Sequence, residues 1–316
     1  MKQRAALREL AEEGVLLTAR ALDAGWPKRS LARALRADGW TPLRKGAWVE
    51  PGRNPNLVIR LRAEQLLNPR LVVSHRSAAV LWRIETLSRA SRPPLEFTDP
   101  TLSHRPEGRD VRVYRTCLEQ ANVFERRGLW TTGPVRTLTD LLLAGPRNDA
   151  LVAVDSGLAR RTVNGVRRAP LTDLDTISAA LGERGRVRVR GAVRARAWLH
   201  LCDPLAGSPA ETIARLRMHD AGLHPESQVA LRSPDGRGIV PDFLFRAEGL
   251  AVEIEGYAYH GARADHRRDV IRFNALQQCP EIRCVLRFTA EDAFHRPERM
   301  IQEIHAALAA ARTSSM

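Results

Sequence analysis

This sequence of 316 residues has few lysines, few cysteines and no long apolar runs. Its four cysteines form no C-x-x-C pair and no repeated spacing, which argues against a disulfide framework or a zinc ribbon. No apolar run approaches the ~18 residues of a membrane span. The N-terminus mixes acids with apolar residues, unlike a signal peptide. The sequence therefore predicts a cytoplasmic protein that contacts no membrane.

Positive charge comes almost entirely from arginine, because Lys2, Lys28 and Lys45 are the only lysines. The 50 Lys and Arg residues against 36 Asp and Glu give a net charge of +14, which favours an anionic partner, most commonly nucleic acid. GC-rich coding would produce the same arginine excess without selection for binding. Composition alone leaves both explanations open, and the length allows two or three domains.

Residues 18–48 predict two short helices around a tight turn. Thr18 is expected to cap the first helix and Gly25 to end it. The second helix is expected to begin after Pro27 and to end at Gly39. On the second helix, arginines share one side while leucines share the other. A helix that enters the DNA major groove needs this division, since Arg neutralises phosphates and bonds to guanine edges. The candidate DNA-binding residues on this helix are Arg29, Arg33 and Arg36.

The segment WTPLRKGAWVEPG that follows predicts a basic hairpin with Arg44 and Lys45 at its turn. Helix, helix and basic hairpin in this order favour a winged helix-turn-helix; the alternative is a solvated basic helix beside a surface hairpin. Residues 14–52 resemble the winged helix-turn-helix of AbiEi-family antitoxins and related regulators. We therefore expect a DNA-binding domain over residues 1–56, with Arg44 and Lys45 adding phosphate contacts.

Residues 57–200 are expected to form an α/β middle region. LVVSHRSAAVLWRI predicts a helix with Ser74 as its cap, LEFTDP and VRVYRT predict short strands, and TTGPVRTLTDLLLAG predicts a loop that enters a helix. His75 is expected to be a polar cap or surface residue without a functional role. The middle region is also similar to the C-terminal half of AbiEi-type proteins.

A second concentration of arginine lies between residues 184 and 196. It could follow a phosphate backbone or be a solvated face, and Gly182, Gly185 and Gly191 suggest a partly flexible passage. Beyond it, residues 201–316 predict a third domain. Its first helix has Ser208 as N-cap, Pro209 at the first helical position and Glu211 in a capping-box position.

The stretch VPDFLFRAEGLAVEIEGYAYH predicts a hairpin that brings acids together. If residues 242–245 and 250–255 are strands joined by a four-residue loop, Asp242 lies opposite Glu253, and Glu255 shares their face. Carboxylates about 6 Å apart repel by about 3 kcal/mol at an effective dielectric constant of about 20, so the cluster invites a cation. Mg²⁺ or Mn²⁺ would suit such ligands, whereas a solvent-facing acidic edge strand is the alternative.

Residues 208–308 resemble the DUF559 domain, which is similar to very short patch repair endonucleases of the PD-(D/E)xK superfamily. The resemblance rests on Glu211, then VPDF, then AVEIEG, His260, RRDVIRFNAL and VLRFTAED. It implies that Glu211, Asp242, Glu253 and Glu255 are candidate catalytic acids, with Asp242, Glu253 and Glu255 as metal ligands and His260 as a catalytic partner.

One departure from that pattern concerns lysine. A Lys usually follows the last acid by two residues, but Glu255 is in that place, and no Lys occurs after Lys45. Positive charge at the transition state would then come from the metal with Arg268, Arg272 or His260.

The sequence as a whole predicts an α/β multidomain bacterial protein with an N-terminal winged helix-turn-helix, an α/β middle region and a C-terminal restriction-endonuclease-like α/β/α domain. DNA binding joined to Mg²⁺-dependent phosphodiester hydrolysis is the leading functional hypothesis. The alternatives are a non-catalytic, antitoxin-like repressor, with a cognate toxin as partner, and a protein-interaction adaptor.

Overall fold

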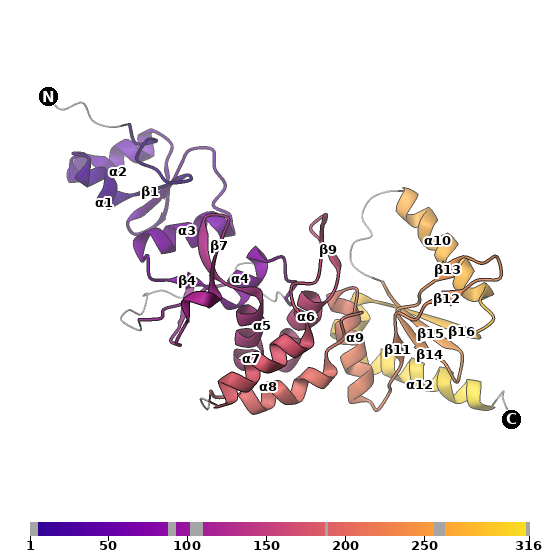
Figure 1. Cartoon of the computed structure of the whole chain (residues 1–316). Coiled ribbons are helices and arrows are strands. Elements are labelled where there is room, and N and C mark those ends of the chain that lie inside the picture. The colour runs from indigo at the N-terminus through magenta and orange to yellow at the C-terminus, as the bar shows by residue number, and fades with distance from the viewer. Residues whose placement is uncertain (1–5, 88–92, 102–109, 187–188, 256–262, 314–316) are drawn as a thin grey trace. The chain divides into compact units, whose positions relative to one another are not determined.

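The computed structural model describes residues 6–87, 93–101, 110–186, 189–255 and 263–313, without the side chains of residues 263–270. It is a mixed α/β protein with several small sheets (Figure 1). Two compact units are resolved: unit 1 comprises Met1–Trp82 and Ser88–Thr137, and unit 2 comprises Arg83–Leu87 and Leu138–Met316. The three-domain division at residues 56 and 200 stays a prediction.

Unit 1 begins with two helices and a hairpin. The elements are β1 (Val15–Leu17), α1 (Thr18–Asp23), α2 (Lys28–Ala37), β2 (Thr41–Arg44) and β3 (Ala47–Val49). β3 pairs antiparallel with both β1 and β2. Leu31 and Leu35 of α2 are buried against Trp40 and Trp48, which anchors one side of the helix. Thr18 is the first residue of α1 and does not cap it, because the N-cap position belongs to Leu17.

The remainder of unit 1 is a five-stranded sheet with two helices. Its elements are α3 (Leu57–Leu67), β4 (Val72–Val73), α4 (His75–Leu81), β5 (Leu95–Thr98), β6 (Val111–Tyr114), η1 (Gln120–Asn122), β7 (Val123–Arg126) and β8 (Leu129–Thr132). The strand order is β6-β5-β4-β8-β7. Asn56 caps α3 by accepting a hydrogen bond from the Ile59 backbone. Ile59 packs under the hairpin and Leu61 under the five-stranded sheet, so α3 joins the two parts.

His75 contradicts the expectation of a cap or surface residue. It is buried, with 4% of its surface exposed, and its ring stacks on Tyr114 at a centroid distance of 3.4 Å. Ser74 is the N-cap residue of α4, as predicted, but its hydroxyl contacts His75 Nδ1 at 2.9 Å and makes no capping hydrogen bond. Pairing of β5 with β6 sets Tyr114 beside the start of α4, a contact that no local pattern indicates.

Unit 2 begins with a helical part. α5 (Pro134–Ala144) crosses the boundary between the units, and α6 (Arg147–Leu158), β9 (Arg161–Val163), β10 (Val166–Arg168), α7 (Leu174–Arg186), α8 (Ala192–Trp198) and η2 (Leu199–Leu201) follow. Gly182 and Gly185 lie inside α7, so they belong to a regular helix instead of the passage expected, and Gly191 is the N-cap of α8.

The second part of unit 2 is a four-stranded sheet between helices. Its elements are α9 (Pro209–Asp220), β11 (Glu226–Ser227), β12 (Leu231–Arg232), β13 (Gly238–Ile239), β14 (Phe243–Phe245), β15 (Leu250–Glu255), α10 (Arg263–Gln278), β16 (Cys284–Thr289), α11 (Ala290–His295) and α12 (Pro297–Thr313). The strand order is β11-β14-β15-β16, with β15 and β16 parallel and the other pairs antiparallel. Val252 and Ile254 of β15 pack with residues of α9, α11 and α12 on one face. Ala251 packs on the other face with Leu276 of α10.

A buried ion pair links the two parts of unit 2. Asp155 of α6 accepts hydrogen bonds from Arg215 Nη2 at 2.7 Å and Thr212 Oγ1 at 2.9 Å, both on α9. Burial nevertheless raises the pKa of Asp155 to about 6. Removing one partner of such a pair would leave an uncompensated buried charge, so the pair fixes how α6 and α9 meet. Within the part of the chain described above, no helix has the length and apolar character needed to span a bilayer.

Candidate functional site

Three buried carboxyl groups lie on three different elements of unit 2. Glu211 on α9 and Asp242 just before β14 are each 8% exposed, and Glu253 on β15 is 5% exposed. We call these residues the acid cluster. Burying a charge is expensive unless it is paired or bound to a metal, so each member should have an identifiable partner.

The predicted hairpin is confirmed, and its register explains why Asp242 meets Glu253. Phe245 pairs with Leu250 and Phe243 with Val252, which brings the preceding and following residues opposite each other. The Asp242 N–H donates to Glu253 Oε1 at 3.3 Å, and the Ile254 N–H donates to Asp242 Oδ2 at 2.8 Å. Backbone hydrogen bonds therefore fix the positions of both carboxyl groups.

Gln228 links Glu211, the third member of the acid cluster, to Asp242. Sequence reasoning did not identify Gln228 as a site residue. Its Nε2 donates to Glu211 Oε2 at 3.0 Å and to Asp242 Oδ1 at 3.1 Å. Its φ of 50° lies in the left-handed region, which costs a residue other than glycine of order 1–3 kcal/mol. No local signal marks this residue, because its role depends on acids 17 residues before it and 14 after it.

Glu211 keeps only half of its predicted capping role. The Ser208 hydroxyl caps α9 by accepting from the Glu211 N–H at 3.1 Å, as expected. For the reciprocal bond of a capping box, the Glu211 carboxylate would accept from the Ser208 backbone N–H; instead its Oε2 accepts from the Gly207 N–H at 2.7 Å. A Cβ at Gly207 would lie 3.0 Å from Glu211 Oε1, so this glycine lets the backbone approach the acid closely.

Arg272 on α10 brings one cation to two members of the acid cluster. Its Nη2 lies 2.7 Å from Glu253 Oε2 and 3.6 Å from Asp242 Oδ1, and it donates to the Val240 carbonyl at 3.1 Å. The Arg272 guanidinium therefore lies beside the hairpin, close to the carboxylates of both Asp242 and Glu253. Arg272 is one of the candidate sources of positive charge, and its catalytic role stays a prediction.

The environment disfavours ionisation of all three acids. Burial, helped by the Asp242 charge and opposed by Arg272, raises the pKa of Glu253 to about 7. Burial also raises the pKa of Asp242 and that of Glu211, the latter with a contribution from Asp242. With a pKa of about 7, the Glu253 carboxyl is partly protonated at neutral pH. Strongly shifted pKa values of this kind cluster at functional sites and also occur in structural ion-pair networks.

The other predicted site residues are not joined to this cluster. Glu255, at the end of β15, pairs with Arg287 Nη2 at 2.5 Å. His260 lies outside the described residues, and Arg268 is described only as a position on α10. Among the described residues, no three His, Cys, Asp or Glu side chains are arranged so that they could hold a metal ion. The metal roles of Asp242, Glu253 and Glu255 stay predictions.

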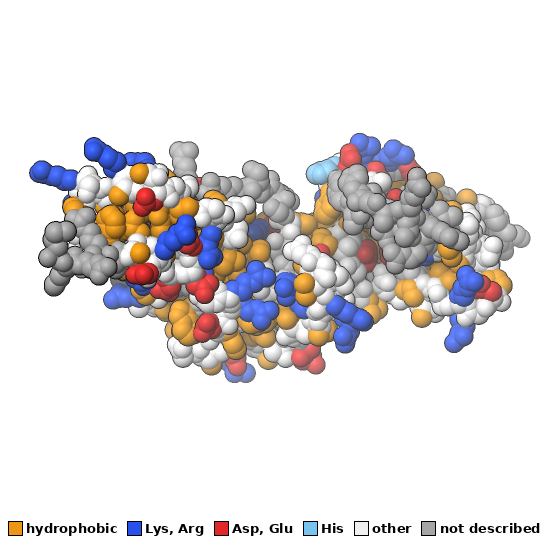
Figure 2. All heavy atoms as spheres, turned by 90° about the horizontal axis from the view of Figure 1, so that it is seen from above, with side chains coloured by type: hydrophobic (Ala, Val, Ile, Leu, Met, Phe, Trp, Pro, Cys, Tyr) orange, Lys and Arg blue, Asp and Glu red, His pale blue; other side chains and the backbone are white. Residues whose placement is uncertain are grey.

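In unit 1, the residues predicted to bind DNA form one exposed face of α2. The exposed arginines Arg29, Arg33 and Arg36, which we call the α2 arginine stripe, lie opposite the buried Leu31 and Leu35. Lys and Arg side chains project from the end of unit 1 that carries α1 and α2 (Figure 2).

The hairpin residues differ from each other. Lys45 is exposed at the turn, whereas Arg44 Nη1 pairs with the buried carboxylate of Glu64 on α3. Because Glu64 already matches its charge, Arg44 is held within unit 1, which opposes its predicted phosphate contact. The phosphate contact of the exposed Lys45 stays a prediction.

Comparisons with known proteins give distant similarity. No family model matches the sequence. The uncharacterized protein Rv2248 of Mycobacterium tuberculosis H37Rv is 28% identical over 232 residues, which cover 73% of this chain and 79% of that protein. The uncharacterized protein MT2308 of strain CDC 1551 matches equally. The crystal structure of RV2827C protein from M. tuberculosis is similar with a TM-score of 0.42 and 19% identity, covering 72% of this chain and 87% of that one.

Proposed function

We propose that this protein binds DNA through a winged helix-turn-helix formed by α1, α2 and the β2–β3 hairpin. We further propose that it hydrolyses phosphodiester bonds with a Mg²⁺- or Mn²⁺-dependent, restriction-endonuclease-like part of unit 2. The observation that carries the proposal is the position shared by Arg272, Asp242 and Glu253, because it identifies a point where a cation contacts two buried carboxylates.

The chemistry of this donor set fits a hard divalent cation. Mg²⁺ binds through one or two carboxylates and completes its shell with water and substrate phosphate. Asp242 and Glu253 supply oxygens on the same side of the hairpin, where Nη2 of Arg272 lies 3.6 Å from Asp242 Oδ1 and 2.7 Å from Glu253 Oε2. Movement of the half-exposed Arg272 side chain would give the ion access to both carboxylates. We assign Asp242 and Glu253 as the residues that would hold it.

Each side chain of the site has a distinct task in this proposal. A bound divalent ion would lower the pKa of its water and neutralise charge on the scissile phosphate. Gln228 donates to both Asp242 and Glu211, so it holds the Asp242 carboxyl in place relative to Glu211. Arg272, once displaced from the acids, supplies the positive charge to the phosphate that the absent lysine would provide.

The test is a cleavage screen of plasmid, nicked and mismatched DNA with and without Mn²⁺ or Mg²⁺. Wild-type protein should cut at least one substrate only with metal, and Asp242→Asn and Glu253→Gln should remove that activity. Glu303→Gln is the matched control, because Glu303 pairs with Arg299 on the exposed face of α12. Metal-dependent cleavage that persists in Asp242→Asn would overturn the assignment of the acids.

A second function, that of a non-catalytic DNA-binding regulator with a toxin as protein partner, is favoured by a different observation. Arg272 already compensates the acids, and no three described side chains are arranged to hold a metal ion. In this function the acid cluster and Arg272 stabilise unit 2 without chemistry. DNA binding that is unaffected by divalent ions, together with unchanged melting on addition of Mn²⁺, would support the regulator.

A further inference from the structure

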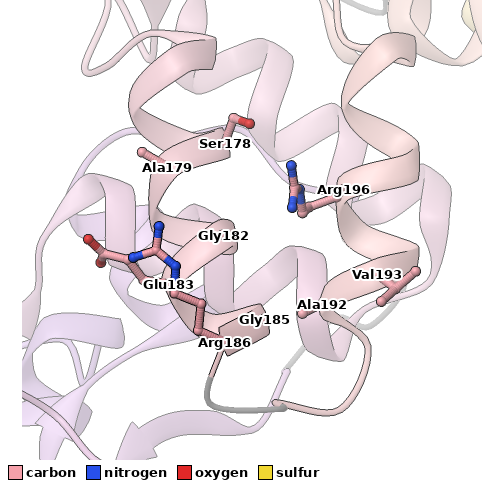
Figure 3. A pocket seen from close by; sticks show the side chains of 9 residues that line it. All are labelled: Ser178, Ala179, Gly182, Glu183, Gly185, Arg186, Ala192, Val193 and Arg196. Carbon is pink, nitrogen blue, oxygen red and sulfur yellow. The ribbon is translucent and has the colours of Figure 1, made fainter.

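Unit 2 contains a hollow between α7 and α8, formed by residues that precede the acid cluster in the sequence. Its volume is about 630 Å³, and we call it the α7–α8 hollow. Figure 3 shows α7 on one side, contributing Ser178, Ala179, Gly182, Glu183, Gly185 and Arg186, and α8 on the other, contributing Ala192, Val193 and Arg196. Arg196 extends from α8 toward the space between the helices.

Small residues form the floor of the hollow. A Cβ placed at Gly182 would meet no atom within 4 Å, and one at Gly185 would touch only the Ala192 Cβ at 4.0 Å. Val193 is 85% exposed, and no Leu, Ile, Phe, Trp or Met lines the hollow. The floor therefore permits close approach of a ligand but offers no large apolar side chain to anchor one.

Arginines supply the charge around this floor. Arg186 and Arg196 line the hollow from opposite helices, and Arg190 is exposed in the connection between them. The structure records no ion-pair partner for these three within its described part. By contrast, Arg184 pairs with buried Asp140 at 2.9 Å, and Arg194 lies over Trp198 at 4.9 Å. The arginine concentration thus separates into Arg184 and Arg194, which contact other side chains of the protein, and an exposed group of Arg186, Arg190 and Arg196.

We propose that the α7–α8 hollow binds the sugar-phosphate backbone of nucleic acid. Arg196 extends toward the space between the helices and Arg186 lines the hollow from α7, and phosphate oxygens accept paired hydrogen bonds from Arg. A docked protein helix would require apolar anchors, and the floor lacks them. The inference rests on the proposed DNA binding but adds a second contact surface, in unit 2, that does not use the α2 arginine stripe. Glu183 on the rim opposes phosphate and limits the affinity.

Full-length protein and a mixed-sequence DNA duplex provide the test, with binding followed by fluorescence anisotropy over a range of salt concentrations. Joint replacement Arg186→Ala and Arg196→Ala should weaken binding and reduce the slope of log K against log salt by about 2, since each phosphate contact contributes about 0.9. Gly182→Glu should also weaken binding, whereas Gly182→Ala is the matched control that adds a Cβ without a clash. Glu183→Gln should strengthen binding.

Two further measurements separate this inference from the proposed function. In protein whose α2 arginine stripe is replaced by alanine, residual DNA binding should remain and should fall again with Gly182→Glu. Hydrogen exchange of residues 174–198 should slow when DNA is added and stay unchanged with polyglutamate. If the α7–α8 variants bind DNA as wild type does while the stripe variant is weakened, only this inference is overturned. Protection by polyglutamate instead of DNA would assign the hollow to an acidic protein, and absence of DNA binding by wild type would overturn both.

Discussion

Replacement of Glu253 by glutamine should stabilise the protein at alkaline pH and change little at acidic pH. In the folded protein, burial raises the pKa of this carboxyl from its ordinary value of 4.5 to about 7. That difference corresponds to about 3 kcal/mol at about 1.4 kcal/mol per pKa unit. The amide of glutamine keeps the shape of the protonated acid and can still accept from the Asp242 N–H. Above pH 8 the variant should therefore gain up to about 3 kcal/mol in its free energy of unfolding.

The sign follows from proton binding. Between about pH 4.5 and 7 the folded state holds a proton at Glu253 that the unfolded state has released, so wild-type stability falls as pH rises through this range. Asp155, whose pKa is raised to about 6, acts in the same direction at lower pH in both proteins. The difference between wild type and variant therefore isolates Glu253. It should be near zero below pH 4.5 and should grow to its full size above pH 7.

The measurement is calorimetric melting of wild type and Glu253→Gln across this pH range. Hydrogen exchange of β15 shows which melting transition belongs to unit 2. Saturating Mn²⁺ should close the gap at pH 8, because a ligand at about 100 times its Kd stabilises by about 2.7 kcal/mol and the variant lacks one ligand. Glu303→Gln is the control. A variant that melts below wild type at every pH would refute the reasoning, since it would show that the ionised carboxylate stabilises the fold.

The other predictions concern unit 1. Joint replacement of the α2 arginine stripe by alanine should reduce the slope of log K against log salt for duplex binding by about 3, at about 0.9 per phosphate contact. An unchanged gel-shift isotherm would discard the proposed recognition helix. Arg44→Ala should lower the stability of unit 1 by about 1–3 kcal/mol, because buried Glu64 would lose its partner. Lys45→Ala should leave melting unchanged and reduce the slope by about 1; a loss of slope in Arg44→Ala without destabilisation would reverse these two roles.

Local patterns predicted the elements of this structure better than their contacts. The α2 stripe, the hairpin after it and the β14–β15 pairing follow from helical and strand periodicity, which the sequence carries directly. Ser208 was identified as a cap because the capping hydrogen bond spans only three residues. Strand alternation likewise placed Asp242 and Glu253 together, since the loop between them is short.

Contacts over long sequence distances account for what was missed. Gln228 reaches Glu211 and Asp242 through the packing of β11 beside β14, and His75 stacks on Tyr114 through the five-stranded sheet. Glu64 pairs with Arg44 across 20 residues of chain, which competes with the predicted wing contact. Such partners are set by tertiary packing, which neither propensity nor periodicity contains.

Calorimetric titration of Mn²⁺ into the full-length protein at pH 7 tests the central claim most directly. Because the pKa of Glu253 is about 7 and those of Asp242 and Glu211 are also raised, metal binding must expel protons. The apparent enthalpy should therefore change with the ionisation enthalpy of the buffer. Affinity should rise with pH and should be lost in Glu253→Gln and Asp242→Asn but not in Glu303→Gln. Wild-type protein that binds DNA yet shows no saturable Mn²⁺ binding at any pH would contradict the account.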